Sequence, residues 1–208
     1  SSASAIVGGL ALARSLVLTG EQYMSDDNLI TLATELEGHP DNVAAAFYGG
    51  ATIAWVESKI NDDGSNTNIG KAVSLKVDDR IKALLLVPDN QLATAKARKL
   101  LPESIPHQDA VLNSARTALL VHALAERPDL LFTATQDLLH QSYRAQAMPK
   151  TIALVDKLRG AGLAAVVSGA GPSVMVLYAG GEDEIDQLQS IASGFSAMKL
   201  AIAKAGVQ

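Results

Sequence analysis

A short bend in the sequence carries four side chains that can do chemistry. Glu37, His39, Asp41 and Asn42 lie close together in the chain, with a glycine and a proline between them. Because glycine and proline interrupt regular structure, we expect these side chains on a bend rather than along one face of a helix. Carboxylates bind hard cations, and an imidazole or a carboxamide can orient a polar ligand. The alternative is a loop before a capped helix, since Asp and Asn are preferred at helix N-termini.

A second candidate site lies at the start of the chain. Ser1, Ser2 and Ala3 open an apolar stretch with helical spacing that runs to about residue 18. The free amides of a first helical turn, together with serine hydroxyls, make a ready anion site. The alternative is a serine cap on a buried helix.

Composition restricts the class of protein. The chain has 208 residues, of which 48% are hydrophobic, so we expect a globular protein with a sizeable core. No apolar run reaches the length of a membrane span, so no membrane partner is expected. A net charge of −5 and an aromatic content of 4% argue against nucleic acid as a partner. The absence of cysteine excludes disulfides and fits a reducing cytoplasm, and the four histidines lack zinc-ligand spacing.

The order of predicted elements indicates an α+β fold in two parts. The first part should hold helices up to residue 18 and over 29–37, and strands over 50–57 and 71–77 around a polar loop at 61–68. The second part should alternate strands with helices, in the order strand-helix-strand-strand-helix-strand that defines the split βαβ plan. Its strands are predicted over 81–87, 163–167, 174–178 and 197–203, and its helices over 94–101, 109–126, 129–139, 149–160 and 182–193.

Three separated stretches resemble the GHMP kinase superfamily, and within it the homoserine kinase family. They are Ser1-Ser2-Ala3, Glu37-Gly38-His39-Pro40-Asp41-Asn42-Val43 with Gly49-Gly50, and Ser168-Gly169-Ala170-Gly171-Pro172-Ser173. The three stretches follow one another in the family's order and together span nearly the whole chain. The resemblance implies the C-terminal part of a two-domain kinase: a partial N-terminal, ATP-binding domain over 1–79 and a ferredoxin-like split βαβ domain over 80–208. It further implies ATP-dependent phosphorylation of L-homoserine in threonine biosynthesis, with Mg²⁺ as cofactor and a homodimer as one possible assembly.

The resemblance also implies a role for each site residue. For the phosphates of ATP it indicates Ser1, Ser2, Ala3, Gly169 and Gly171. For the metal it indicates Ser2 and Glu37, with Glu35 as the competing carboxylate; Glu37 is favoured because it directly precedes the glycine, as in the family. For catalysis it indicates Asn42 and Glu37. For the substrate it indicates His39, Asp41, Asn42, Thr94, Arg98 and Arg144.

Residue chemistry agrees with these roles. A carboxamide cannot accept a proton usefully at neutral pH, so Asn42 should orient the substrate hydroxyl, and the proton should pass to the γ-phosphate or to water. Guanidinium groups grip carboxylates through two parallel hydrogen bonds, which suits Arg98 and Arg144 to the homoserine carboxylate. Thr94 lies one helical turn before Arg98. The alternative for Arg98 is an exposed basic helix, beside Lys96 and Lys99.

Two other functions stay open at this point. A kinase of the same fold could act on mevalonate or another small alcohol, although an asparagine at position 42 argues against it. A non-catalytic amino-acid sensor or dimerisation module would use only the split βαβ half and would leave Glu37 and His39 unexplained. Because the family's phosphate loop begins before its serines, we expect that the family's earlier strands are missing and that these 208 residues alone are not a competent kinase.

Overall fold

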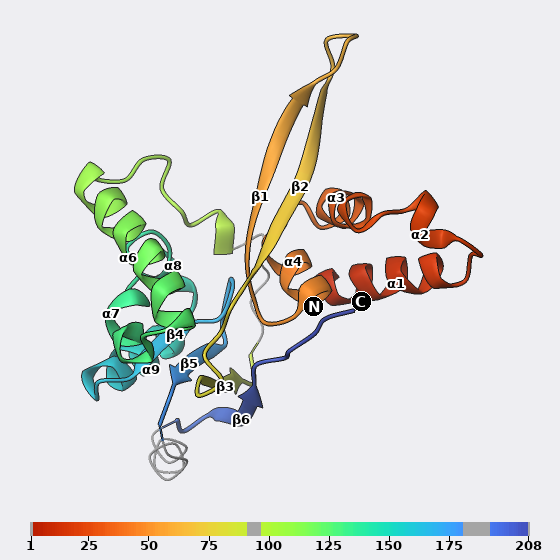
Figure 1. The fold of residues 1–208 in the computed structure, drawn as a ribbon. Helices are drawn as coiled ribbons and strands as arrows, with labels where there is room; N and C mark the ends of the chain where they lie inside the picture. Colours follow the sequence, from red (N-terminus) through yellow and green to blue (C-terminus); the bar gives the residue numbers. More distant parts are fainter. Residues whose placement is uncertain (1, 91–96, 181–191, 208) are drawn as a thin grey trace. The chain divides into compact units, whose positions relative to one another are not determined.

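The computed structural model describes residues 2–90, 97–180 and 192–207. Helices and strands mix along the chain, which confirms the predicted α+β class (Figure 1). The chain forms two compact units, one of Ser1–Lys76 with Ile202–Gln208 and one of Val77–Ala201. The C-terminal tail belongs to the first unit, where the Val207 amide donates a hydrogen bond to the Ala46 carbonyl at 3.3 Å. The domain boundary that we expect between residues 79 and 80 stays a prediction.

Helices of the first unit share one apolar core. Its side chains come from α1 (Ser2–Ser15), α3 (Asp26–Glu37) and α4 (Asp41–Tyr48), whereas the single-turn helix α2 (Gly20–Tyr23) contributes none. Small residues of α1 allow close packing, and its core positions recur at helical spacing. The fully buried side chains of this core are Ala3, Val7, Leu29, Ile30, Ala33, Val43 and Phe47.

The first helix ends earlier than predicted. It stops at Ser15 rather than near residue 18. The apolar residues that follow, Leu16 to Leu18, are exposed and do not continue the buried stripe. Thr19 then adopts a left-handed conformation (φ 64°), which turns the chain into α2.

A long two-stranded ribbon completes the first unit. β1 (Ala51–Ile60) pairs with β2 (Asn66–Leu75) in antiparallel register from Ala51 opposite Leu75 to Ile60 opposite Asn66. Both strands reach further toward the turn than predicted, so the polar connection shrinks to residues 61–65. Side-chain hydrogen bonds across the ribbon, such as Ser58 to Asn68 at 2.9 Å, favour this extension. Figure 1 shows the hairpin end carried away from α3 and α4.

The second unit is built on a four-stranded sheet. β3 (Lys82–Pro88), β4 (Ala164–Val167), β5 (Val174–Tyr178) and β6 (Phe195–Ala201) lie in the order β4-β5-β3-β6, and every pair is antiparallel. This order confirms the predicted split βαβ plan. Leu154, Val155 and Leu158 of α9 (Pro149–Gly160) pack on buried residues of β3, β4 and β5 to form the core. The last strand starts and ends two residues before its predicted bounds.

The prediction of one helix over residues 129–139 is wrong. In its place are a 3₁₀ turn, η1 (Pro128–Leu130), and a single turn, α7 (Leu131–Ala134). The Thr135 hydroxyl donates to the Leu131 carbonyl at 2.7 Å, and the Asp137 side chain accepts backbone amides that follow it. Such local side-chain bonds compete with the backbone ladder of a helix.

Other helices among the described residues of this unit are α6 (His107–Ala125), α8 (Gln141–Arg144) and η2 (Ala145–Ala147). The predicted helix over 182–193 and most of the one over 94–101 fall outside the described residues. None of the described helices is long and apolar enough to cross a membrane.

Candidate functional site

In the first unit, a serine and a glutamate from distant parts of the chain meet at one point. The Ser2 hydroxyl donates a hydrogen bond to Glu37 Oε1 at 2.7 Å, across 35 residues of sequence. Ser2 starts α1 and Glu37 ends α3, and the buried Ala3 anchors the start of α1 in the core. The Glu37 side chain is 9% exposed, whereas Glu35 is exposed. Of these two carboxylates, the structure therefore brings only Glu37 to Ser2.

A glycine ends α3 and turns the chain toward the next polar residues. Gly38 is left-handed (φ 85°), a conformation that glycine adopts without strain, and its amide donates to the Thr34 carbonyl at 2.8 Å. His39 follows, with Nε2 3.9 Å from Glu37 Oε1 and Nδ1 in a short contact with Asp41 Oδ1. The bend predicted around Gly38 thus aligns an imidazole between two carboxylates.

Asp41 and Asn42 start α4. The cap residue of this helix is Pro40, which makes no side-chain hydrogen bond, so neither Asp41 nor Asn42 is the N-cap that the alternative reading required. Asp41 Oδ1 instead accepts the Asn42 amide at 2.7 Å. Both side chains reach solvent, whereas Val43 and Ala44 immediately after them are buried. The buried residues fix the backbone while the two polar side chains remain accessible to a ligand.

The Ser2 and Glu37 oxygens are a donor set that suits a hard cation. Magnesium usually takes one or two protein oxygens and completes its shell with water and phosphate oxygens. The described residues hold no group of three or more His, Cys, Asp or Glu side chains arranged to bind a metal by themselves. The chemistry of this pair therefore fits a cation that arrives with a phosphate ligand, and does not fit a closed structural metal site.

In the second unit, the predicted site residue Arg144 is a buried charged side chain. It ends α8, is 8% exposed, and donates from Nη1 to the Gly169 carbonyl at 3.3 Å. Its Nε is buried and has no hydrogen-bond partner among the described residues. Burial lowers the pKa of Arg144; Asp137 opposes that shift, and the positive charge of Arg98 adds to it. A desolvated guanidinium with unused donor capacity is suited to bind an anion.

The positive charge of Arg98 lowers the pKa of Arg144. The two arginines predicted to bind the substrate carboxylate are therefore close enough to interact through their charges. Arg98 is exposed. Thr94 and Ser1, which were also predicted for the site, lie outside the described residues.

The predicted glycine turn joins β4 to β5. Gly169 and Gly171 have positive φ angles of 58° and 85°. A Cβ on Gly171 would meet the Met148 sulfur at 2.6 Å, whereas a Cβ on Gly169 would meet nothing within 4 Å. The Ser168 amide donates to the Ser173 carbonyl at 2.8 Å and closes the turn. A residue with a Cβ at position 171 would therefore need the left-handed conformation and a shift of the Met148 side chain.

Sequence reasoning passed over Asp137 and Gln141. The Asp137 carboxylate accepts three backbone amides and the His140 ring, which lower its pKa to about 2 although burial raises it. The Gln141 side chain accepts the Val167 amide at 2.7 Å. The available signal was an aspartate followed within four residues by a histidine and a glutamine, but the apolar spacing of 129–139 hid it.

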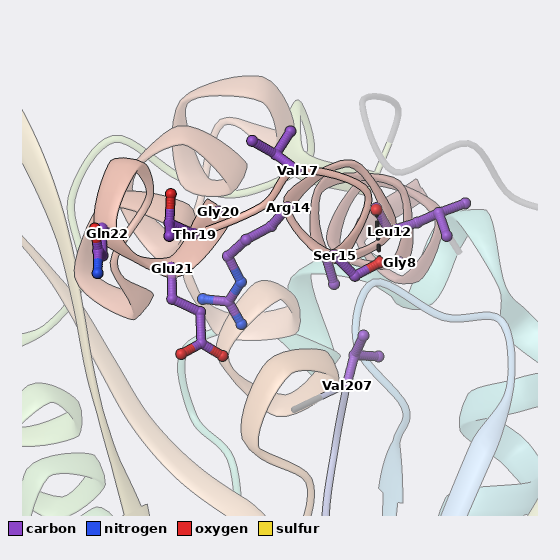
Figure 2. Close-up of a pocket in the computed structure, with 11 residues that line it drawn as sticks. Gly8, Leu12, Arg14, Ser15, Val17, Thr19, Gly20, Glu21, Gln22 and Val207 are labelled. Carbon is purple, nitrogen blue, oxygen red and sulfur yellow. Dashed lines mark hydrogen bonds between the residues drawn. The ribbon is translucent and has the colours of Figure 1, made fainter.

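A hollow of about 710 Å³ lies at the other end of α1 from Ser2, lined by α1, α2 and Val207 (Figure 2). Figure 2 shows Arg14 and Glu21 among its labelled side chains. Arg14 is already paired with Asp26 at 2.6 Å. The sequence predicts no site residue here, and we assign this hollow no role.

Two family models match the chain. The GHMP kinases N terminal domain matches residues 1–50, and the model described as GHMP kinases C terminal matches residues 115–196. The homoserine kinase of Streptomyces coelicolor is 47% identical over 192 residues, which cover 92% of this chain and 59% of the relative. That of Mycobacterium tuberculosis is 44% identical over 207 residues, covering 99% and 64%. The chain thus spans about six-tenths of the length of these curated relatives.

Solved structures agree on the fold. The crystal structure of homoserine kinase from Cytophaga hutchinsonii aligns with a TM-score of 0.66 at 22% identity, over 88% of this chain and 60% of that one. The resemblance drawn from three short motifs is confirmed, because the same chain matches both family models and the homoserine kinases. This chain belongs to the GHMP kinase superfamily, and homoserine kinases are its relatives.

Proposed function

We propose that the protein transfers the γ-phosphoryl group of ATP to the side-chain hydroxyl of L-homoserine. The observation that carries the proposal is the pairing of the Ser2 hydroxyl with the Glu37 carboxylate, beside His39, Asp41 and Asn42. The identities to homoserine kinases support the choice of substrate.

Phosphoryl transfer asks a protein chiefly for positioning and for charge stabilisation. Ser2 and Glu37 would hold Mg²⁺ through their oxygens. The bound ion would neutralise charge on the phosphate oxygens. The amides of the first turn of α1, next to Ser2, would donate to phosphate oxygens, as helix N-termini commonly do.

Asn42 would orient the attacking hydroxyl. Its exposed carboxamide can accept the hydroxyl proton in a hydrogen bond but cannot remove it. The proton would pass to the transferred phosphate or to water, since a loose transition state needs little activation of the nucleophile. His39 and Asp41 would bind or orient the substrate.

Arg98 and Arg144 would bind the substrate carboxylate. The unpaired, buried Nε of Arg144 supports this role, because a carboxylate could accept from it and from the neighbouring Nη atoms. Roles of Ser1, Ala3, Thr94, Gly169 and Gly171 toward ATP or substrate stay predictions, as do a homodimer and a cytoplasmic location.

A coupled ADP-release assay tests the proposal. The intact protein, not these 208 residues alone, should release ADP with L-homoserine, and only at background rates with mevalonate or L-threonine. Equal or faster turnover of mevalonate would favour a kinase of the same fold that acts on mevalonate. Homoserine or threonine binding without ADP release would favour an amino-acid sensor, and either result would reject the proposed activity.

A further inference from the structure

We propose that Asp137 is a positioning residue, which fixes α8 so that Arg144 presents its guanidinium to the substrate carboxylate. The inference rests on the proposed function and deepens it, because it explains how this chain sustains a buried arginine at its substrate site.

The Asp137 carboxylate accepts several hydrogen bonds from the residues at the start of α8. Its Oδ1 accepts from the Leu139 amide at 3.2 Å and contacts His140 Nδ1 at 3.0 Å. Its Oδ2 accepts from the amides of His140 at 2.9 Å and Gln141 at 2.6 Å. The carboxylate therefore collects the free amides at the start of a single-turn helix, which has little stability of its own.

The same short helix is bonded to β4 at one end and to the turn after β4 at the other. At its first residue, the Gln141 side chain accepts the Val167 amide at 2.7 Å. At its last residue, Arg144 donates to the Gly169 carbonyl at 3.3 Å. Asp137 thus holds the start of α8 through its backbone amides, Gln141 holds the first residue of α8 on β4, and the guanidinium lies at the other end of the helix.

Charge gives Asp137 a second action on Arg144. Arg144 is 8% exposed and feels the repulsion of Arg98, so its charged form is costly to keep. Asp137 supplies the compensating negative charge within the same unit. A neutral residue that only capped α8 would leave Arg144 without this compensation.

Steady-state kinetics on the intact protein with Asp137→Asn test the inference. Asparagine keeps the size and part of the capping but removes the charge. The KM for homoserine should rise about tenfold, while kcat and the KM for ATP stay within about twofold. Asp129→Asn is the matched control: Asp129 pairs with Arg127 on the surface of the same unit, so all three constants should stay within about twofold of wild type.

A competitor without a carboxylate separates positioning from general damage. 3-Amino-1-propanol matches homoserine except for that group, so its inhibition constant should be the same in wild type and in Asp137→Asn. If homoserine and 3-amino-1-propanol both bind more weakly by the same factor, the inference is overturned, since Asp137 would then support the site as a whole. If Asp137→Asn does not fold, Asp137→Glu, which keeps the charge, takes its place. This variant should bind homoserine with an affinity within about threefold of wild type. A loss of affinity of about tenfold or more would overturn the inference.

The outcomes also separate this inference from the proposed function. If wild type phosphorylates homoserine and Asp137→Asn has the same homoserine KM, the inference fails and the proposed function stands. If wild type releases no ADP with homoserine, both fail.

Discussion

At the scale of single residues, the candidate site depends on contacts between groups far apart in sequence. Glu37 is shielded and bonded to Ser2, whereas Glu35, two positions earlier, is exposed. One turn of a helix thus carries two identical side chains in opposite environments. The contrast supplies a variant and its control on the same helix.

Glu37→Gln should lower kcat about 10- to 100-fold and raise the magnesium concentration needed for half-maximal rate. A neutral amide balances less of the cation charge, and losses of this size are typical when a metal environment is disturbed. Glu35→Gln should behave as wild type. A magnesium titration of Glu37→Gln that overlays wild type would remove Glu37 from the metal site.

Asn42→Asp should not give a faster enzyme. A carboxylate at this position would repel the γ-phosphate unless it were protonated, and the proposed role of Asn42 is orientation rather than proton removal. The measurement is kcat with saturating homoserine and ATP at pH 7 to 8. A kcat above the wild-type value would show that a base at position 42 helps, and the orienting role would then be wrong.

Arg144→Leu and Arg98→Leu should each raise the KM for homoserine and leave the KM for ATP nearly unchanged. Losing a charge-assisted contact to a carboxylate costs about 2–3 kcal/mol, which corresponds to about 30- to 150-fold. Arg127→Leu, which removes an exposed partner of Asp129 in the same unit, is the control and should have little effect. Wild-type homoserine KM in both variants would reject the assignment.

At the scale of elements, the turn between β4 and β5 shows how packing and conformation act separately. Gly169 and Gly171 are both left-handed, but only Gly171 faces a buried neighbour, Met148, which is 2% exposed. The Thr151 hydroxyl of α9 donates to the Pro172 carbonyl at 2.8 Å and holds the turn against the helix. A Cβ would therefore have space at Gly169, whose carbonyl accepts from Arg144, but not at Gly171 unless Met148 shifts.

Alanine substitutions at the two glycines should separate these effects. Gly169→Ala should lower the free energy of unfolding by about 1 kcal/mol, the usual cost of a left-handed residue with a Cβ. Gly171→Ala should cost about 3 kcal/mol, because overpacking against Met148 adds to that strain. Thermal unfolding followed by circular dichroism measures both, and equal losses would show that Met148 yields without cost.

At the scale of the whole molecule, stability at low pH should depend on Asp137. Its folded-state pKa is about 2, below the ordinary value of 3.8, because the His140 ring and three amides favour the charged form. A depressed pKa gives stability that is complete above about pH 4 and disappears as the pH falls through 2. Since the carboxylate is partly solvated, the contribution should be about 1–2 kcal/mol.

Urea unfolding of wild type and Asp137→Asn at pH 6, 4 and 2.5 tests this. The difference in unfolding free energy should shrink between pH 4 and 2.5. Circular dichroism is the suitable signal, since the single tryptophan, Trp55, lies in the other unit. A difference that does not change with pH would mean that capping, not charge, accounts for the contribution of Asp137 to stability.

The sequence alone determined the motifs and the order of elements. Glycine and proline at positions 38 and 40, and the glycines at 169 and 171, marked the turns, because few other residues adopt their backbone conformations. Period-2 and helical spacing predicted most strands and helices, and their order was enough for the split βαβ sheet. Periodicity failed over 129–139, since it records apolar spacing and not the side-chain bonds of Thr135 and Asp137 that end a helix.

Which groups meet depends on how distant segments pack together. The packing of α1 on α3 brings Ser2 to Glu37 and leaves Glu35 in solvent. The fold of the second unit buries Arg144 on the Gly169 carbonyl and connects it to Asp137 through one turn of helix. These pairings depend on burial of apolar surface between distant segments, which is not directional and has no local pattern that a sequence can display.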